Sequence, residues 1–260
     1  MILAGVPNAE LTEIKRNAGT IVQACADIKA GKRFETVAKL DPDAGANLQL
    51  FECADEDAQI DMLRRLYMGW KAAGKRDAVW DIQVLCPMNE KSQVSRVPLN
   101  KLLQAILNPT GVDADESAVG EFRLGDKVIC LKNCILQAQE LAPGLSRTDA
   151  NGYRPAKDQS WQTYQHYLAN GDLGRVEAVD VQARTLIVTS AMPTRTVKVP
   201  LGKQDAEGEA SGGGTATDFA LAYAITGHKS QGSEWPIVVV VIDEAAGMVS
   251  CREWIYTAIS

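Results

Sequence analysis

The chain has 260 residues, of which 46% are hydrophobic and 23% are charged, a composition typical of a soluble globular protein with one large or two smaller domains. No stretch approaches the roughly 18 consecutive apolar residues of a membrane span, and no basic leader precedes an apolar core at the start, so neither a membrane segment nor a signal peptide is expected. The formal net charge of −6 argues against non-specific affinity for nucleic acid through bulk charge. Any contact with DNA must therefore come from a local site.

The cysteines do not form a metal-binding pattern. There are six of them, scattered along the chain: Cys25, Cys53, Cys86, Cys130, Cys134 and Cys251. Cys130 and Cys134 are four residues apart, but neither a second pair nor a histidine partner completes a zinc site. The sequence therefore predicts no metal centre. Free and mostly buried thiols are typical of a reducing cytoplasm, which is the expected compartment.

The first half of the chain alternates predicted helices and strands. Apolar residues recur at three- and four-residue steps in residues 8–31, which predicts a helix ended by a glycine. Residues 47–53 predict a short strand, residues 55–74 a helix with an acidic start, and residues 81–87 a second strand. Strand, helix and strand at this spacing predict a βαβ unit with a right-handed crossover. A core-packing helix is expected at residues 99–108, before a proline.

Short β-prone runs replace this alternation after residue 120. Regularly spaced runs of this kind predict a small β-barrel, and they lie at residues 122–133, 170–180, 185–189 and 194–199. Residues 138–169 are polar and irregular, which indicates a long loop or a short helix. Residues 204–217 are rich in glycine, alanine and serine and predict a flexible linker. The barrel is expected to be a separate unit whose removal leaves the α/β part able to fold.

A dense polar turn lies between two apolar runs near the end of the chain. The run at residues 237–243 is β-branched and uninterrupted, which is typical of a strand buried on both faces of a parallel sheet. The turn before it, residues 226–236, offers hydroxyls, an imidazole, an ammonium group, an amide and a carboxylate. Polar groups between buried runs are costly unless they serve a purpose, so this turn is the main candidate site.

The amino-acid sequence of the turn resembles that of one family. Residues 222–236, AYAITGHKSQGSEWP, closely resemble the fifth conserved motif of superfamily 1 DNA helicases, in the RecD-like branch. Residues 252–260 resemble the start of the sixth motif, and residues 11–18 resemble the fourth. Three motifs in the family's order extend the resemblance over nearly the whole chain.

The resemblance implies an α/β fold, a RecA-like parallel sheet with helices on both faces, interrupted by a small inserted SH3-like β-barrel. The second motor domain of a helicase would comprise residues 1–118 and 215–260. The barrel would comprise residues 119–205, and a glycine-rich linker would comprise residues 206–214. The chain would then be the C-terminal motor half of an ATP-dependent DNA helicase or translocase of the type associated with exodeoxyribonucleases in DNA repair and recombination.

The resemblance also implies roles for individual residues. Three would contact the backbone of single-stranded DNA, because hydroxyl, imidazole and ammonium groups donate to phosphate oxygens: Thr226, His228 and Lys229. Three would contribute to the nucleotide site, the last of them at the ribose: Gln231, Gly232 and Glu234. Arg16 would be the catalytic residue that reaches the γ-phosphate of ATP from the opposite domain, since its planar fork suits phosphate oxygens and stays charged.

The sequence contains no GxxxxGK[ST] phosphate loop. ATP and Mg²⁺ would therefore be shared with a first, N-terminal motor domain that this sequence does not include, and the chain alone is expected to hold neither and to be inactive. Its expected partners are single-stranded DNA and that first motor domain, with no membrane. The resemblance leaves room for nuclease or recombination subunits as further partners.

Two other interpretations are open. A nucleic-acid-binding or protein-docking module that has lost ATP use would not need Arg16 and Glu234. An intact small NTPase would use the glycines at residues 212–214 together with Asp243, because an apolar strand that ends in Asp-Glu looks like a metal-holding segment. The missing phosphate-loop lysine argues against it. The favoured interpretation makes residues 239–246 a core strand that ends in solvated acids.

Overall fold

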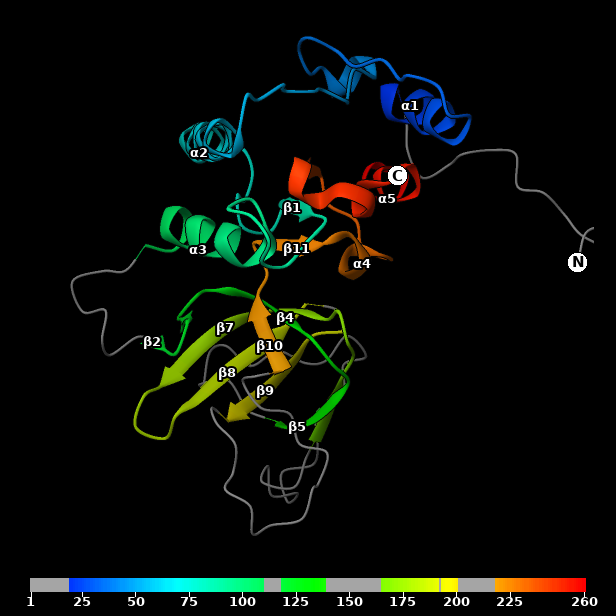
Figure 1. The fold of residues 1–260 in the computed structure, drawn as a ribbon. Coiled ribbons are helices and arrows are strands. Elements are labelled where there is room, and N and C mark those ends of the chain that lie inside the picture. The colour runs from blue at the N-terminus through cyan, green and yellow to red at the C-terminus, as the bar shows by residue number, and fades with distance from the viewer. Residues whose placement is uncertain (1–18, 110–117, 139–164, 192, 201–217) are drawn as a thin grey trace, which may run out of the picture.

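The computed structural model describes residues 19–109, 118–138, 165–191, 193–200 and 218–260. Figure 1 shows two parts, helices around a short parallel sheet above and a curled antiparallel sheet below. The upper part is built from Thr20–Lys29 (α1), Glu56–Ala73 (α2), Ile82–Cys86 (β1), Arg96–Leu107 (α3), Ala224–Thr226 (β11), Gly227–Ser230 (α4), Ile237–Val240 (β12) and Arg252–Ile259 (α5), with 3₁₀ turns at Pro42–Ala44 and Glu244–Ser250.

The lower part is a seven-stranded antiparallel sheet in the order β10-β4-β7-β8-β9-β5-β6. Its strands are Lys127–Cys130 (β4), Cys134–Ala138 (β5), Gln165–Leu168 (β6), Leu173–Asp180 (β7), Thr185–Ser190 (β8), Arg195–Pro200 (β9) and Phe219–Leu221 (β10), and a small separate pair is formed by Ala118–Val119 (β2) and Phe122–Arg123 (β3). Among the described strands the pairing does not close into a ring. A mixed α/β fold is therefore confirmed, whereas the SH3-like and RecA-like assignments stay predictions.

The centre of the parallel sheet is β1, not the strand after the polar turn. The order is β11-β1-β12, and all five residues of β1 are buried. The prediction that the run from residue 237 is buried on both faces is wrong, because β12 lies at the edge and Val238 is 38% exposed. Ile237 and Val239 pack against one hydrophobic cluster and Val240 against another, while the second edge of β12 has no strand beside it in the described ranges.

The predicted strand at residues 47–53 is also absent, and with it the predicted βαβ unit. This segment is extended but pairs with no strand of the sheet, and Leu50 and Phe51 are 59% and 41% exposed. Both edges of β1 are already taken, by β11 and β12. Strand formation depends on packing against neighbouring segments as well as on the pattern, so an alternating run alone does not make a strand.

The predicted helices are confirmed where the structure describes them. The Asp55 carboxylate accepts a hydrogen bond from Ala58 N at 2.8 Å and caps α2, and Gly74 ends that helix in the left-handed conformation. The helix expected at residues 99–108 is α3, with Asn108 at its C-cap. Residues 20–29 of the first expected helix are α1, and the rest of its N-terminal half lies outside the described residues.

A polar ladder on α3 joins the two parts. Asn100, Gln104 and Asn108 lie four residues apart on one helical face. Gln104 Nε2 and Asn108 Nδ2 donate to the carboxylate of Asp126, at the start of β4, at 2.6 and 2.7 Å. The buried Asp126 also accepts from Arg123 N and the Tyr223 hydroxyl, at 2.7 and 2.9 Å, so both its oxygens are satisfied.

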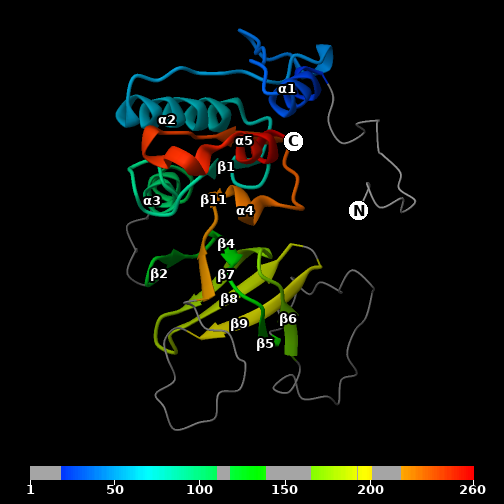
Figure 2. The same cartoon turned by 45° about the vertical axis from the view of Figure 1, so that its right-hand side comes forward.

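The two parts also share one hydrophobic core. Leu63 of α2 and Leu99 of α3 belong to the same buried cluster as Val128, Val176 and Val188 of the antiparallel sheet. This continuity argues against the expectation that the β-rich segment can be removed without harm to the α/β part. Figure 2 shows β10 running from the antiparallel sheet toward the parallel one, so the segment after residue 217 belongs to both. None of the helices in the described ranges combines the length and apolarity that a membrane crossing needs.

Candidate functional site

The polar turn begins at the carboxyl edge of the parallel sheet. Thr226 is the last residue of β11 and lies opposite Cys86, the last residue of β1, in the parallel register. It is half-buried, occupies the N-cap position of α4, and makes no side-chain capping bond. Ligands of open α/β sheets bind outside the carboxyl ends of the strands, and the Thr226 hydroxyl lies at such an end.

The single turn of α4 has one buried side and one exposed side. Gly227 and Ser230 are buried, with Gly227 packed against the indole of Trp254 and the Ser230 hydroxyl donating to Gly227 O at 2.8 Å. His228 and Gln231 are exposed. The glycine and serine of the motif therefore hold the backbone in place, and the histidine and glutamine are the residues available to a ligand.

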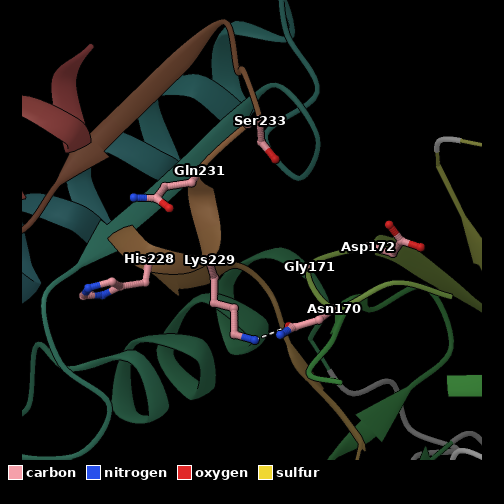
Figure 3. Close-up of a pocket in the computed structure, with 8 residues that line it drawn as sticks. Asn170, Gly171, Asp172, His228, Lys229, Gln231 and Ser233 are labelled. Atoms are coloured by element: carbon pink, nitrogen blue, oxygen red, sulfur yellow. Dashed lines mark hydrogen bonds between the residues drawn. The ribbon is translucent and has the colours of Figure 1, made fainter. Parts of the chain in front are cut away.

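Lys229 reaches across to the antiparallel sheet. Its ammonium group donates to Leu131 O at 3.2 Å, in the loop between β4 and β5, and to Asn170 Oδ1, in the turn between β6 and β7. Figure 3 shows the Lys229 side chain directed toward Asn170, with His228 pointing away from it. Both partners lie far from Lys229 in the sequence.

A polar pocket of about 270 Å³ lies between the turn and the β6–β7 hairpin (Figure 3). The structure brings four predicted residues to it together with four that were not predicted: His228, Lys229, Gln231, Gly232, Asn170, Gly171, Asp172 and Ser233. Gly232 has a positive φ of 87°, which lets the chain turn away from α4. The pocket combines an ammonium, an imidazole, amides and a carboxylate, which suits a hydrogen-bonding anionic or sugar-like group better than an apolar ligand.

The other predicted residues lie apart from this pocket. Thr226 is at the strand end, and the exposed Glu234 lies in the last part of the turn. Arg16 lies outside the described residues, as do the glycines of the rival NTPase interpretation. Asp243, the other residue of that rival, caps the following 3₁₀ turn by accepting from Ala246 N at 2.8 Å and also bonds the Ser92 hydroxyl. A carboxylate engaged in this way is a local structural group rather than a metal ligand.

No metal-binding group is evident in the described ranges, where no three His, Cys, Asp or Glu side chains come together. The Cys86 thiol at the sheet edge is buried, and burial raises its pKa to about 12, so it is not a nucleophile at neutral pH. The side chains of the turn offer hydrogen bonding and charge to a ligand.

One family model matches the segment that contains the polar turn. The family model of the UvrD-like helicase C-terminal domain matches residues 221–260, which run from β10 through the polar turn to the end of α5. This match covers the fifth-motif and sixth-motif segments. It confirms the resemblance to superfamily 1 helicases on the same residues that carried it in the sequence.

One similar protein is the ATP-dependent RecD2 DNA helicase of Deinococcus radiodurans. The two are 27% identical over 263 residues, an alignment that covers 98% of this chain and 27% of the relative. The resemblance to the C-terminal half of a RecD-like superfamily 1 helicase is thereby confirmed. The chain spans about a quarter of the length of this relative.

Proposed function

We propose that this chain is the second motor domain of an ATP-dependent DNA helicase or translocase and supplies one face of both its DNA site and its ATP site. The observation that carries the proposal is the placement of the fifth-motif turn, which leaves the carboxyl edge of a buried parallel sheet with its histidine and glutamine exposed and its glycine packed on Trp254. A ligand bound there would contact a turn that is attached to the sheet and packed on α5. Its binding could therefore move both elements together, as in a motor domain that closes on a ligand.

Thr226, His228 and Lys229 are the proposed contacts to single-stranded DNA. Hydroxyl, imidazole and ammonium groups donate to phosphate oxygens and make the grip independent of base sequence. The Lys229 ammonium has three donors, of which Leu131 O and Asn170 accept two in this structure. The remaining donor can meet a phosphate while the lysine stays held by the antiparallel sheet.

Gln231, Gly232 and Glu234 are the proposed nucleotide contacts, and Arg16 is the proposed catalytic residue at the γ-phosphate. An exposed amide and an exposed carboxylate fit the ribose side of a nucleotide. The described residues offer no cluster of acids for Mg²⁺. The donor set thus fits half of an ATP site, with the metal and the triphosphate held by a first motor domain.

Binding of a fluorescent single-stranded oligonucleotide by the full chain tests the DNA proposal. We expect weak, salt-sensitive binding without base preference, which Thr226→Val and His228→Ala each weaken. Lys229→Ala should reduce the dependence of log K on log salt by about 0.7, the value of one phosphate contact on a single strand. Lys75→Ala, which removes an exposed cation next to α2, is the charge-matched control and should change little. Strong preference for one base sequence, or equal effects of Lys229→Ala and Lys75→Ala, would contradict the assignment.

Steady-state ATP hydrolysis tests the nucleotide proposal. The chain alone should show no measurable turnover with or without single-stranded DNA, because it has no phosphate loop. Turnover in the usual enzyme range of about 1–1000 per second from pure material would refute a half site. DNA binding without any stimulation of an added first motor domain would favour the docking-module alternative.

A further inference from the structure

Two thiols meet beneath the loop that supports the pocket. Cys130 ends β4 and Cys134 begins β5, and their Sγ atoms lie 3.6 Å apart in hydrogen-bonding contact. Both side chains are buried. The three residues between them form a short loop in which Lys132 and Asn133 are exposed, so solvent lies one residue away from the pair.

The thiol pair lies between two strands that are consecutive in the chain but do not pair with each other. In the sheet order, β4 pairs with β10 and β7, whereas β5 pairs with β9 and β6. A bond between the two sulfur atoms would therefore cross-link two strands that β7, β8 and β9 separate in the sheet order. Cys86 and Cys251 have no such neighbour, and the structure records all the described cysteines as free thiols.

The two sulfur atoms have different surroundings. The contact between them lowers the pKa of Cys130 and raises the pKa of Cys134. Cys130 Sγ also donates to Lys132 O at 2.9 Å, and a carbonyl oxygen does not stabilise a thiolate. Either sulfur can therefore be the thiolate that attacks an oxidant, and the other sulfur lies 3.6 Å away to resolve it.

The loop above the pair holds the pocket together. Leu131 O accepts from Lys229, and Asn133 Oδ1 accepts from Asn170 N at 2.8 Å. Lys132 forms an ion pair with Asp218 at 2.7 Å. Cys130 itself exchanges backbone bonds with the β6–β7 turn, accepting from Gly171 N at 2.8 Å and donating to Asp172 O at 2.9 Å. Movement at Cys130 therefore reaches the pocket through bonds already present.

We propose that Cys130 and Cys134 form a redox-active dithiol, which a peroxide oxidises to a disulfide that repositions loop 131–133 and, with it, Lys229. The thiolate of one cysteine attacks one peroxide oxygen, the O–O bond breaks, and that cysteine becomes a sulfenic acid as hydroxide leaves and takes a proton to form water. The sulfur of the second cysteine then attacks the sulfur of the sulfenic acid, and its proton leaves with the hydroxyl group as a second water. Two thiols are oxidised and one peroxide is reduced. The proposal does not depend on the helicase function.

Mass spectrometry after brief treatment of the full chain with hydrogen peroxide tests the chemistry. We expect a linked Cys130–Cys134 peptide that lacks two hydrogen atoms and is restored by dithiothreitol. Cys251→Ser, which removes an exposed and isolated thiol, is the matched control and should give the same linkage. In Cys134→Ser and in Cys130→Ser, dimedone should trap a sulfenic acid on the remaining cysteine of the pair, because no second thiol is left to form the disulfide. Failure to form the linkage while the protein stays folded, or no sulfenic acid in either variant, would overturn the proposal.

Hydrogen exchange tests the link to the pocket. The amides of Asn170 and Gly171 donate to the loop and to Cys130, so their exchange rates should change several-fold on oxidation. The amide of Val84, in the buried strand β1, is the internal control and should not respond. Unchanged exchange at Asn170 and Gly171 in a fully linked protein would refute the coupling to Lys229.

Discussion

Replacing Gly227 by alanine tests how closely the fifth-motif turn packs on the sixth-motif helix. A Cβ atom at this position would lie 2.7 Å from Nε1, 3.1 Å from Cε2 and 3.4 Å from Cζ2 of Trp254. Gly227 does not have a positive φ, so an alanine is opposed by lack of space rather than by backbone strain. The turn and α5 must therefore separate to admit one methyl group.

The expected cost follows from the contact distances. The indole nitrogen would have to retreat by roughly 0.7 Å to reach ordinary van der Waals contact, and Trp254 is only 7% exposed, so it has little room to do so. Overpacking of this kind costs about 1–3 kcal/mol. Because α4 has only four residues, the helix propensity of alanine offsets little of that cost.

Urea unfolding of the full chain measures the effect. Gly227→Ala should lower the free energy of unfolding by about 1–3 kcal/mol. Gly69→Ala is the matched control, since Gly69 lies in α2 with no atom within 4 Å of its Cβ position and should gain about 0.5–1 kcal/mol. In a Trp254→Leu background the cost of Gly227→Ala should nearly vanish. A Gly227→Ala protein as stable as the parent, or a cost that persists without the indole, would refute the packing argument.

Three further predictions concern charged and polar groups. Burial lowers the pKa of Lys127 to about 8, below its unfolded value of about 10.4, so the folded state loses the proton at a lower pH than the unfolded state. The free energy of unfolding should therefore rise between pH 7 and pH 9, by on the order of 1 kcal/mol more in the parent than in Lys127→Met. Urea unfolding at each pH measures this difference. Asn170→Ala should release one bond of the Lys229 ammonium and strengthen oligonucleotide binding roughly two- to tenfold, the value of one net hydrogen bond, and weaker binding in an anisotropy titration would count against this. In an enzyme assembled with a first motor domain, Arg16→Ala should lower DNA-stimulated ATP turnover by about 10³–10⁵-fold and leave DNA binding nearly intact. Arg16→Lys should not restore turnover fully, because an ammonium group lacks the planar fork of the guanidinium. Near-parental turnover in Arg16→Ala would remove Arg16 from the site.

Local signals in the sequence were sufficient for the helices. The acidic cap and terminal glycine of α2 act within one turn of the chain, so the pattern alone fixes where that helix begins and ends. The strands were harder, because pairing is a property of two segments. Residues 47–53 alternate correctly but find no edge beside β1, and β12 has the composition of a central strand at an edge position.

The polar ladder of α3 could have been predicted from the spacing of its residues. Asn100, Gln104 and Asn108 follow Leu99, Leu103 and Leu107 at a constant spacing of four, which places an amide stripe next to an apolar one. Such a stripe indicates a polar partner across the interface. That the partner is Asp126 could not be predicted, since it comes from a different strand and depends on how the two parts pack.

The candidate site also has a part that the sequence predicts and a part that only the fold creates. The contiguous residues of the fifth motif were found from their spelling, and the structure brings His228, Lys229, Gln231 and Gly232 to one pocket. The Asn-Gly-Asp sequence at residues 170–172 indicated a turn, but this turn was not assigned to the site. Nothing local reveals that this turn faces Lys229, because the contact is created by the curl of the antiparallel sheet.

The turn is held from three directions, and they act on different atoms. The side chain of Asn100 donates to Ala224 O at 2.7 Å and accepts from Ala224 N at 3.0 Å, while Trp254 packs beneath the glycine of α4. These contacts fix the backbone, so they keep Thr226 at the sheet edge. The hairpin, by contrast, contacts only the tip of Lys229. A change in the antiparallel sheet should therefore alter the salt dependence of binding, whereas a change in α5 should move the whole turn and alter every contact it makes.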